Sequence, residues 1–215
     1  MKTKKIGTVI SVLLNIAVAA ATFFAVIEGW KIGDGTAETA RSLRTFRYFT
    51  TDSNILSGIS CAALAVYTLI HPKKDSAAAR FFIKLKFVGV CSVMLTFLVV
   101  IFFLGPNQGY GYMLSGANLW LHAICPLAAF AGFLLFDGGL TQSGKGSLIG
   151  ALPTLLYGAV YFCEVVLLKR WPDFYGFNAG GKWYISLVAV IGGAALFSFL
   201  LSRIKNLLSK KSVNV

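Results

Sequence analysis

Acidic residues and histidines are scarce in this sequence, which has 8 Asp and Glu against 20 Lys and Arg among 215 residues, and only 2 histidines. Charged residues make up 13% of the chain, whereas soluble domains contain about 25%. Hydrophobic residues make up 57%. The composition excludes an ordinary soluble domain and predicts an integral membrane protein.

Cysteine motifs and basic tracts are also missing. The 4 cysteines lie inside apolar runs without CxxC spacing, which excludes a disulfide framework and a zinc site. We therefore expect no metal and no cofactor. The basic residues lie at the ends of apolar runs and form no tract with interleaved aromatics, so the net charge of +12 is interpreted as a topology signal with contacts to anionic lipid headgroups. Nucleic-acid binding is not expected.

Six apolar runs are long enough to cross a bilayer, which takes about 20 residues in a helix. The runs are Ile6 to Ile27, Thr50 to Ile70, Leu85 to Leu104, Leu114 to Phe136, Leu148 to Leu168 and Trp183 to Leu201. The longest connection has no room for another folded domain. The sequence predicts one all-α domain over residues 1–215, a polytopic bundle of six transmembrane helices.

The basic residues are distributed unevenly over the connections. With six spans both termini lie on one side, and that side holds most of the Lys and Arg: Lys2, Lys4, Lys5, Lys73, Lys74, Arg80, Lys84, Lys86, Lys145, Arg203, Lys205, Lys210 and Lys211. Positive charge accumulates in cytoplasmic connections. We predict cytoplasmic N- and C-termini and a multi-pass protein of the bacterial inner membrane.

The second run begins with an unusual concentration of polar residues. Thr50, Asn54, Ser57 and Cys61 follow helical spacing and share one stripe, while Asp52 points elsewhere. Lipid offers no hydrogen bonds to such groups, so the stripe must face protein or water. A structural alternative is that Thr50 or a neighbour caps the first turn of the helix.

The fourth run carries the second group of polar residues. Ser115, Asn118, His122 and Cys125 lie at spacings of three and four, and Pro126 follows at once. Proline removes the N–H that would bond to the carbonyl of His122, which predicts a free carbonyl and a kink. Intramembrane histidines are usually functional. A hydrogen bond from His122 to a neighbouring helix is the structural alternative.

The fifth run places Tyr157, Tyr161 and Glu164 on one face, with Lys169 or Arg170 as a possible salt-bridge partner for Glu164. Thr50, His122 and Glu164 all lie in the outer halves of their helices, whereas the cytoplasmic halves contain only Asn15 and scattered hydroxyls. This distribution predicts one polar chamber that opens near the extracytoplasmic leaflet.

The outer connection between the first two runs contains Arg41, Arg44 and Arg47, spaced by three and therefore on one face of a helix. Such a segment is either an interfacial helix that contacts headgroups or a site for an anionic substrate group.

A hydroxyl beside a neutral imidazole is the minimal apparatus for acyl transfer. Thr50 would be the nucleophile and His122 the base. Glu164, Asp52 or Asn118 could orient the imidazole, and Asn54 with the N–H groups at the helix start could stabilise an oxyanion. The apolar surroundings imply a lipid or fatty acyl ester substrate. The residues expected around the substrate are Arg47, Ser57, Tyr157 and Tyr161.

Two segments resemble a known family. Arg47-Tyr48-Phe49-Thr50 with Asp52, Asn54, Ile55 and Leu56, together with Leu119-Trp120-Leu121-His122 and Pro126, is similar to the androgen-induced membrane hydrolase family and its prokaryotic six-span relatives. The resemblance implies a threonine hydrolase that cleaves fatty acid esters of hydroxy fatty acids, with Thr50 and His122 as the catalytic pair. The family's aromatic and proline motif appears here as residues 171–177, interrupted by Asp173.

Two other functions remain open at this point. A small transporter or channel would need a polar path that continues to the cytoplasmic side. A non-catalytic lipid-binding protein would use Thr50 as a cap and His122 as a structural hydrogen bond.

Overall fold

The computed structural model describes residues 2–32, 43–71, 76–138 and 144–211, and every regular element within these ranges is helical. Six helical segments are long and apolar enough to cross a membrane: Ile6–Lys31, Phe49–Ile70, Ala77–Gln108, Gly116–Leu135, Gly146–Leu167 and Trp183–Ser209. The prediction of an integral membrane protein with six apolar helices is confirmed.

Several spans are built from consecutive helical elements. The first three contain α1 (Lys2–Ile32), η1 (Leu43–Arg47), α2 (Phe49–Ile70), α3 (Ala77–Val99) and η2 (Val100–Leu104). The chain then passes through α4 (Gly105–Gln108), α5 (Tyr110–Met113), α6 (Gly116–Leu119), η3 (Trp120–Ile124) and α7 (Cys125–Leu135). It ends with η4 (Gly144–Ala151), α8 (Leu152–Tyr161), η5 (Phe162–Leu167), η6 (Ala179–Gly181) and α9 (Trp183–Lys211). The elements η2, η3 and η5 are π-helical turns, while η1, η4 and η6 are 3₁₀-helical.

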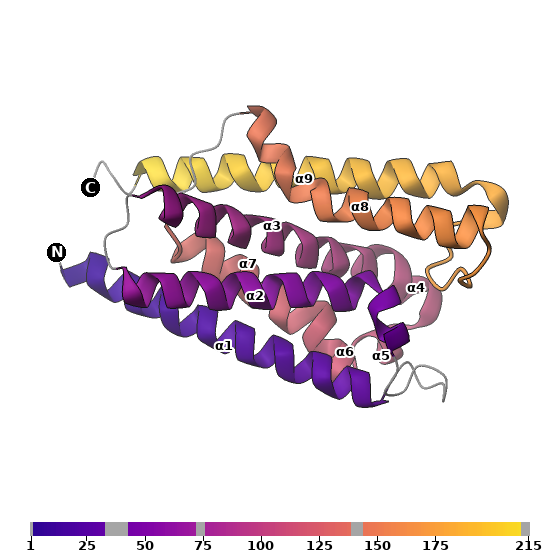
Figure 1. Ribbon diagram of the computed structural model, residues 1–215, viewed down its shortest axis with the longest axis horizontal. Coiled ribbons are helices and arrows are strands. Elements are labelled where there is room, and N and C mark those ends of the chain that lie inside the picture. Colours follow the sequence, from indigo (N-terminus) through magenta and orange to yellow (C-terminus); the bar gives the residue numbers. More distant parts are fainter. Residues whose placement is uncertain (1, 33–42, 72–75, 139–143, 212–215) are drawn as a thin grey trace.

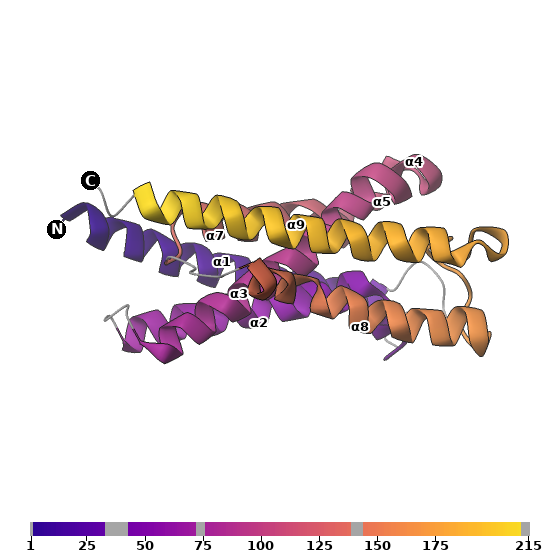
Figure 2. The same ribbon diagram turned by 90° about the horizontal axis from the view of Figure 1, so that it is seen from above.

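The helices pack in two groups around α3 (Figure 1). On one side α1, α2 and α7 contact one another, and α2, α7 and α3 are also in contact. On the other side α9, η4 and α8 pack against α3 and against one another, as the second view also shows (Figure 2). The start of α1 and the end of α9 lie at the same end of the bundle, here called the termini end. The opposite end, where α2 begins, is called the site end.

Close packing of α3 depends on small residues. A Cβ added to Gly89 would lie 2.5 Å from Ser60 Oγ and 3.0 Å from the Cα of Ser57, so a larger residue would force α2 and α3 apart. Gly150 is enclosed in the same way by Cys91 and Ser198. Without a hydrophobic force between helices in lipid, such close contacts are the main source of association.

The third helix begins earlier than the sequence predicted. It starts at Ala77, where Ser76 Oγ accepts the N–H of Ala79 at 3.0 Å as an N-cap. Arg80, Lys84 and Lys86 therefore lie within α3 and not in a connection. Lys86 is only 1% exposed, with Nζ 2.6 Å from Cys61 Sγ. A hydropathy pattern treats lysine as the end of a span, but a lysine with a buried partner does not end the helix.

The expectation of only Asn15 and scattered hydroxyls near the termini end is wrong. Asp137 accepts hydrogen bonds from Ser11 Oγ at 2.7 Å and from Asn15 Nδ2 at 2.9 Å. Lys205 Nζ donates to the last carbonyls of α7, at 2.6 Å to Phe133 and 2.8 Å to Asp137. Ser11, Asn15, Asp137 and Lys205 are each less than 9% exposed. This termini-end cluster ties α1, α7 and α9 together, and its members are too far apart in sequence for spacing to reveal it.

Candidate functional site

Thr50 lies in the first turn of α2 and does not cap the helix. The N-cap position is occupied by Tyr48, which makes no side-chain cap hydrogen bond. Thr50 Oγ1 instead lies 3.4 Å from His122 Nε2, and the two side chains line the same cavity. The structure therefore brings together the two residues that spacing and depth single out.

The imidazole of His122 is fixed by a backbone carbonyl. Its Nδ1 lies 2.7 Å from the carbonyl oxygen of Met113, and the side chain is 6% exposed. A carbonyl oxygen can only accept, so Nδ1 carries the proton and Nε2 of the neutral ring is the free acceptor that faces Thr50. The Met113 carbonyl is available because α5 ends at this residue and the last carbonyls of a helix have no helical donor.

Two π-helical turns followed by proline shape this end of the bundle. In η3 the N–H of Cys125 bonds to the carbonyl of Trp120, and Pro126 has no N–H. In the π register the carbonyl left without a donor is therefore that of Leu121, and Asn54 Nδ2 binds it at 3.0 Å. We predicted a free carbonyl at His122, and the difference follows from the wider helical turn.

The same arrangement occurs in η2. The N–H of Gly105 bonds to Val100, Pro106 follows, and the carbonyl of Ile101 accepts a hydrogen bond from Tyr110 Oη at 2.6 Å. This bond folds α5 back beside η2, because Tyr110 packs where Gly105 has no side chain. The position of Met113, and with it the orientation of His122, depends on this fold.

A polar cavity adjoins Thr50 and His122 on the side of α1 and η3. The space between its walls, including its mouth, is about 960 Å³. Its polar lining consists of Thr45, Tyr48, Thr50, Thr51, Gln108, Tyr112, Asn118, His122 and Tyr175. Gln108 and Tyr112 are exposed, so the cavity opens at the site end of the bundle.

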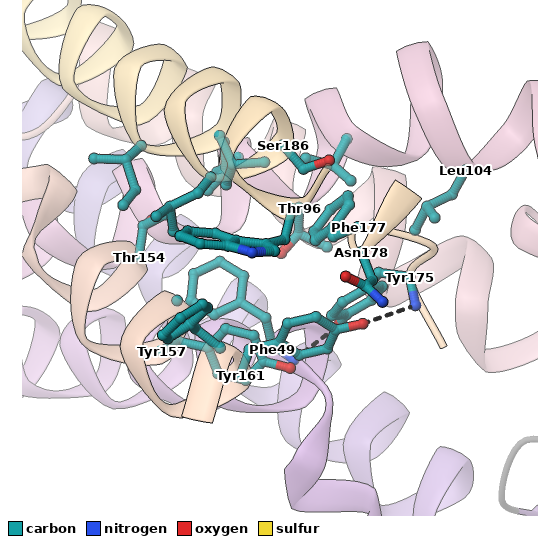
Figure 3. Close-up of a pocket in the computed structure, with 18 of the residues that line it drawn as sticks. Phe49, Thr96, Leu104, Thr154, Tyr157, Tyr161, Tyr175, Phe177, Asn178 and Ser186 are labelled. Atoms are coloured by element: carbon teal, nitrogen blue, oxygen red, sulfur yellow. Dashed lines mark hydrogen bonds between the residues drawn. The ribbon is translucent and has the colours of Figure 1, made fainter. Parts of the chain in front are cut away.

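An apolar pocket adjoins Thr50 on the opposite side, between α3, α8 and α9. The space between its walls, including its open mouth, is about 790 Å³. Figure 3 shows the rings of Phe49, Tyr157 and Tyr161 along one wall, with Thr154 at the far end from Tyr175. Thr50, Leu104 and Tyr175 line both spaces.

Tyr175 is a site residue that the sequence analysis did not single out. Its phenolic oxygen accepts the N–H of Phe49 at 2.8 Å and is also in hydrogen-bond contact with Thr50 and Tyr157. Burial raises the pKa of Tyr175 to about 12, against these hydrogen bonds, which lower it. The hydroxyl is therefore protonated at neutral pH and can donate.

Asp173 holds the segment that carries Tyr175. Its carboxylate accepts hydrogen bonds from Tyr161 Oη at 2.6 Å and from the N–H groups of Phe177 and Asn178 at 2.9 Å. The acidic residue that interrupts the aromatic motif thus folds residues 173–178 over the start of α2. The role of Asp173 depends on the conformation of this loop, which the sequence alone does not reveal.

The four residues expected to support the catalytic pair have other positions. Asn54 is fully buried and donates to the carbonyls of Thr50 and Leu121, so it positions η3 against α2 and faces neither cavity. Asn118 lines the polar cavity. Asp52 is half-buried and lines neither space. Glu164 forms a bidentate ion pair with Arg170, the partner considered for it, and does not contact His122.

Of the four residues expected around the substrate, two line a cavity and two do not. Tyr157 and Tyr161 line the apolar pocket, and Tyr157 Oη donates to the carbonyl of Arg47 at 2.5 Å. The Arg47 guanidinium lies 5.6 Å from the ring centre of Trp171, and Ser57 is buried between α2 and α3. Neither Arg47 nor Ser57 lines a cavity. Arg41 lies outside the described residues.

Comparisons with known proteins add no evidence for function to that of the geometry. Within the described residues no group of three or more His, Cys, Asp or Glu side chains could hold a metal ion. No family model, no curated protein and no solved structure matches the chain.

Proposed function

We propose that this protein is an intramembrane ester hydrolase that acts on a lipid, with Thr50 as nucleophile and His122 as general base. The observation that carries the proposal is the pairing of Thr50 Oγ1 with His122 Nε2 at 3.4 Å, in a ring whose other nitrogen donates to Met113. The hydroxyl, the unprotonated nitrogen and the orienting acceptor are the three parts that an activated nucleophile requires.

The reaction follows from these positions. His122 Nε2 takes the Thr50 proton while Oγ1 attacks the ester carbonyl, and the carbonyl oxygen becomes an oxyanion. Tyr175 is the protonated donor beside Thr50, so its hydroxyl stabilises this oxyanion. Collapse breaks the bond to the alcohol oxygen, which receives the proton from His122. Water from the polar cavity then cleaves the acyl-threonine by the reverse sequence of proton transfers, which restores Thr50 and releases a fatty acid.

The resemblance to the androgen-induced membrane hydrolase family supports the same pair of residues as the catalytic pair. It also supports the proposal that this protein is a prokaryotic six-span relative of that family. We place both termini in the cytoplasm on the distribution of Lys and Arg, which puts the site end near the extracytoplasmic leaflet of a bacterial inner membrane.

A transporter would need the site to connect with the termini end. Neither cavity is lined by Asn15 or Asp137, and the residues of the termini-end cluster are hydrogen-bonded to other protein groups. The described geometry favours a chamber open at one end, which suits a hydrolase better than an alternating-access protein.

The test is turnover of lipid esters by the purified full-length protein in lipid nanodiscs. Thr50→Val keeps the shape of the side chain and removes the nucleophile, so turnover should fall by at least about 10³-fold. Thr68→Val is the matched control on the same helix, because Thr68 donates only to the Leu64 carbonyl near the termini end. Undiminished turnover in a folded Thr50→Val variant would contradict the proposal.

A further inference from the structure

We infer that the ester has a single long acyl chain, bound in the apolar pocket, and an uncharged polyol as its alcohol part, bound in the polar cavity; a monoacylglycerol is the simplest member of this class. The inference rests on the proposed function, since it assigns the acyl chain and the alcohol part of the substrate to the two spaces beside the proposed nucleophile, Thr50.

The first argument is the position of Thr50 between two spaces of opposite character. An ester carbonyl at Thr50 Oγ1 has its acyl carbon on one side and its alcohol oxygen on the other. The space toward α3, α8 and α9 is lined mainly by apolar and aromatic side chains, such as Leu95, Val99 and Leu187. The space toward α1 and η3 offers hydroxyls and amides. The chain and the alcohol therefore have one favourable orientation.

The second argument is access from the bilayer. The wall formed by α3 and η2 contains buried residues, with Leu95 and Val100 at 6% and 1% exposed, whereas the lining residues of α9 are half-buried. Neighbouring α9 residues such as Val188, at 71% exposed, face outward as apolar groups. The pocket thus borders lipid on its α8 and α9 side, from which a hydrocarbon chain enters without crossing water.

The length of the apolar pocket is comparable to the depth of one bilayer leaflet. Along α8 and η5 the pocket extends from Thr154 to Val166, which at 1.5 Å per residue corresponds to roughly 18 Å. One leaflet of the hydrocarbon core is about 15 Å deep. The lining therefore extends along α8 and η5 over about the depth of one leaflet, so an acyl chain of membrane-lipid length has apolar groups beside it along this distance.

The polar cavity has no charged side chain among its described lining residues, which bears on the alcohol part of the ester. Among the described residues that line the polar cavity, none is Lys, Arg, Asp or Glu. A carboxylate or phosphate on the alcohol part would find no cation in this lining to pair with and would depend on water at the cavity mouth for its solvation. Hydroxyls of a polyol would instead find partners among Thr45, Thr51, Gln108 and Asn118.

The experiment compares three esters with the full-length protein in nanodiscs: palmitoylglycerol, butyrylglycerol and the palmitic acid ester of hydroxystearic acid. We expect palmitoylglycerol to exceed the hydroxystearate ester by at least about tenfold in kcat/KM, because the latter puts a carboxylate in the uncharged cavity. Equal or greater turnover of the hydroxystearate ester would overturn the assignment of the alcohol part.

Variants test the acyl side. A Cβ at Gly158 would lie 3.8 Å from Leu187 Cδ1 inside the apolar pocket, so Gly158→Leu should lower palmitoylglycerol turnover about tenfold more than butyrylglycerol turnover. Val190→Phe fills the pocket from the α9 wall and should do the same. Gly193→Leu is the matched control, because Gly193 is exposed with nothing near its Cβ position. Equal losses on both glycerol esters in the two pocket variants would overturn the acyl assignment.

The same measurements distinguish a wrong ligand assignment from a wrong proposed function. If none of the three esters is hydrolysed, or if hydrolysis persists in Thr50→Val, both proposals are wrong. If hydrolysis depends on Thr50 but follows the opposite preferences, only the ligand assignment is wrong.

Discussion

Polar side chains are buried at both ends of the helical bundle, but their surroundings differ. At the site end Thr50 and His122 face a cavity, and the imidazole nitrogen nearest Thr50 has no hydrogen-bond donor other than that hydroxyl in the described structure. At the termini end Asp137 is held by Ser11 and Asn15, and Lys205 by backbone carbonyls. The polar groups of the site end therefore have open space beside them in which a ligand could bind, whereas those of the termini end bind other protein groups.

The site end also deviates most from regular helix. The π-turns η2, η3 and η5 all lie toward this end, whereas α1, α2 and the termini-end half of α9 are regular. Two of these turns precede a proline, and each exposes a carbonyl that a side chain from elsewhere binds. Local irregularity thus supplies the fixed hydrogen-bond groups from which a site is built.

The largest expected effect is the loss of the base at the site end. His122→Ala should lower kcat by roughly 10²–10⁴-fold, with the helical content and melting temperature of the purified protein close to those of the wild type. Circular dichroism and ester turnover measure both. Unfolding of this variant, with activity retained in the folded fraction, would assign His122 to structure and remove the contrast between the two ends.

The next effect lies at the termini end and concerns stability. Asp137→Ala removes the acceptor of Ser11 Oγ and one acceptor of Asn15 Nδ2, which keeps the Ser11 carbonyl. The loss costs about 2 kcal/mol and should lower the melting temperature by roughly 4–8 °C. Turnover per folded molecule should stay unchanged, because Asp137 lines neither cavity. A folded Asp137→Ala protein without activity would indicate a polar path between the ends and favour a transport function.

Tyr175→Phe should have a smaller effect on catalysis. Removal of one oxyanion donor that acts beside Thr50 should lower kcat about tenfold, which is less than the roughly 10²–10³-fold loss known for such donors. The pKa of Tyr175 is raised to about 12, so the phenol stays protonated through neutral pH. Its contribution to stability is complete below about pH 10 and is lost as the pH rises toward 12.

The pH dependence separates a donor from an ionised group. Between pH 6 and 9, values below the Tyr175 pKa of about 12, the kcat profiles of the wild type and Tyr175→Phe should have the same shape. A profile whose basic limb disappears in the variant would contradict the role of a permanently protonated donor.

The smallest effect is expected for Lys86→Met. Lys86 Nζ is buried against Cys61 Sγ, and Lys86→Met removes this buried polar group and leaves only a thiol, a weak acceptor that behaves as a small hydrophobic group when buried. The melting temperature should be unchanged or higher, and turnover should stay within about twofold. A loss of activity without a loss of stability would place Lys86 in the reaction.

The six spans and the buried stripe of α2 could be predicted from the sequence because hydropathy and helical spacing are local properties. Asn54, Ser57 and Cys61 are each at most 2% exposed, as the stripe requires. The proximity of Thr50 and His122 could also be predicted, since both residues lie at similar depth on spans that start from the same end of the bundle.

The remaining parts of the site depend on features that no local pattern contains. The orienting group of His122 is a backbone carbonyl at Met113, and its availability depends on where α5 ends. Tyr175 reaches Thr50 only because Asp173 folds its own loop. The start of α3 at Ala77 was missed because lysine and arginine within a helix resemble a connection in a hydropathy pattern.

The central claim is that Thr50 is a nucleophile activated by His122. The most direct measurement is mass spectrometry of the peptide containing Thr50 after the full-length protein in nanodiscs reacts with an alkyl fluorophosphonate. The wild type should carry a phosphonyl adduct on Thr50, and a folded His122→Ala protein should carry none. An unmodified Thr50 in active wild-type protein, or equal modification in the two proteins, would contradict the account.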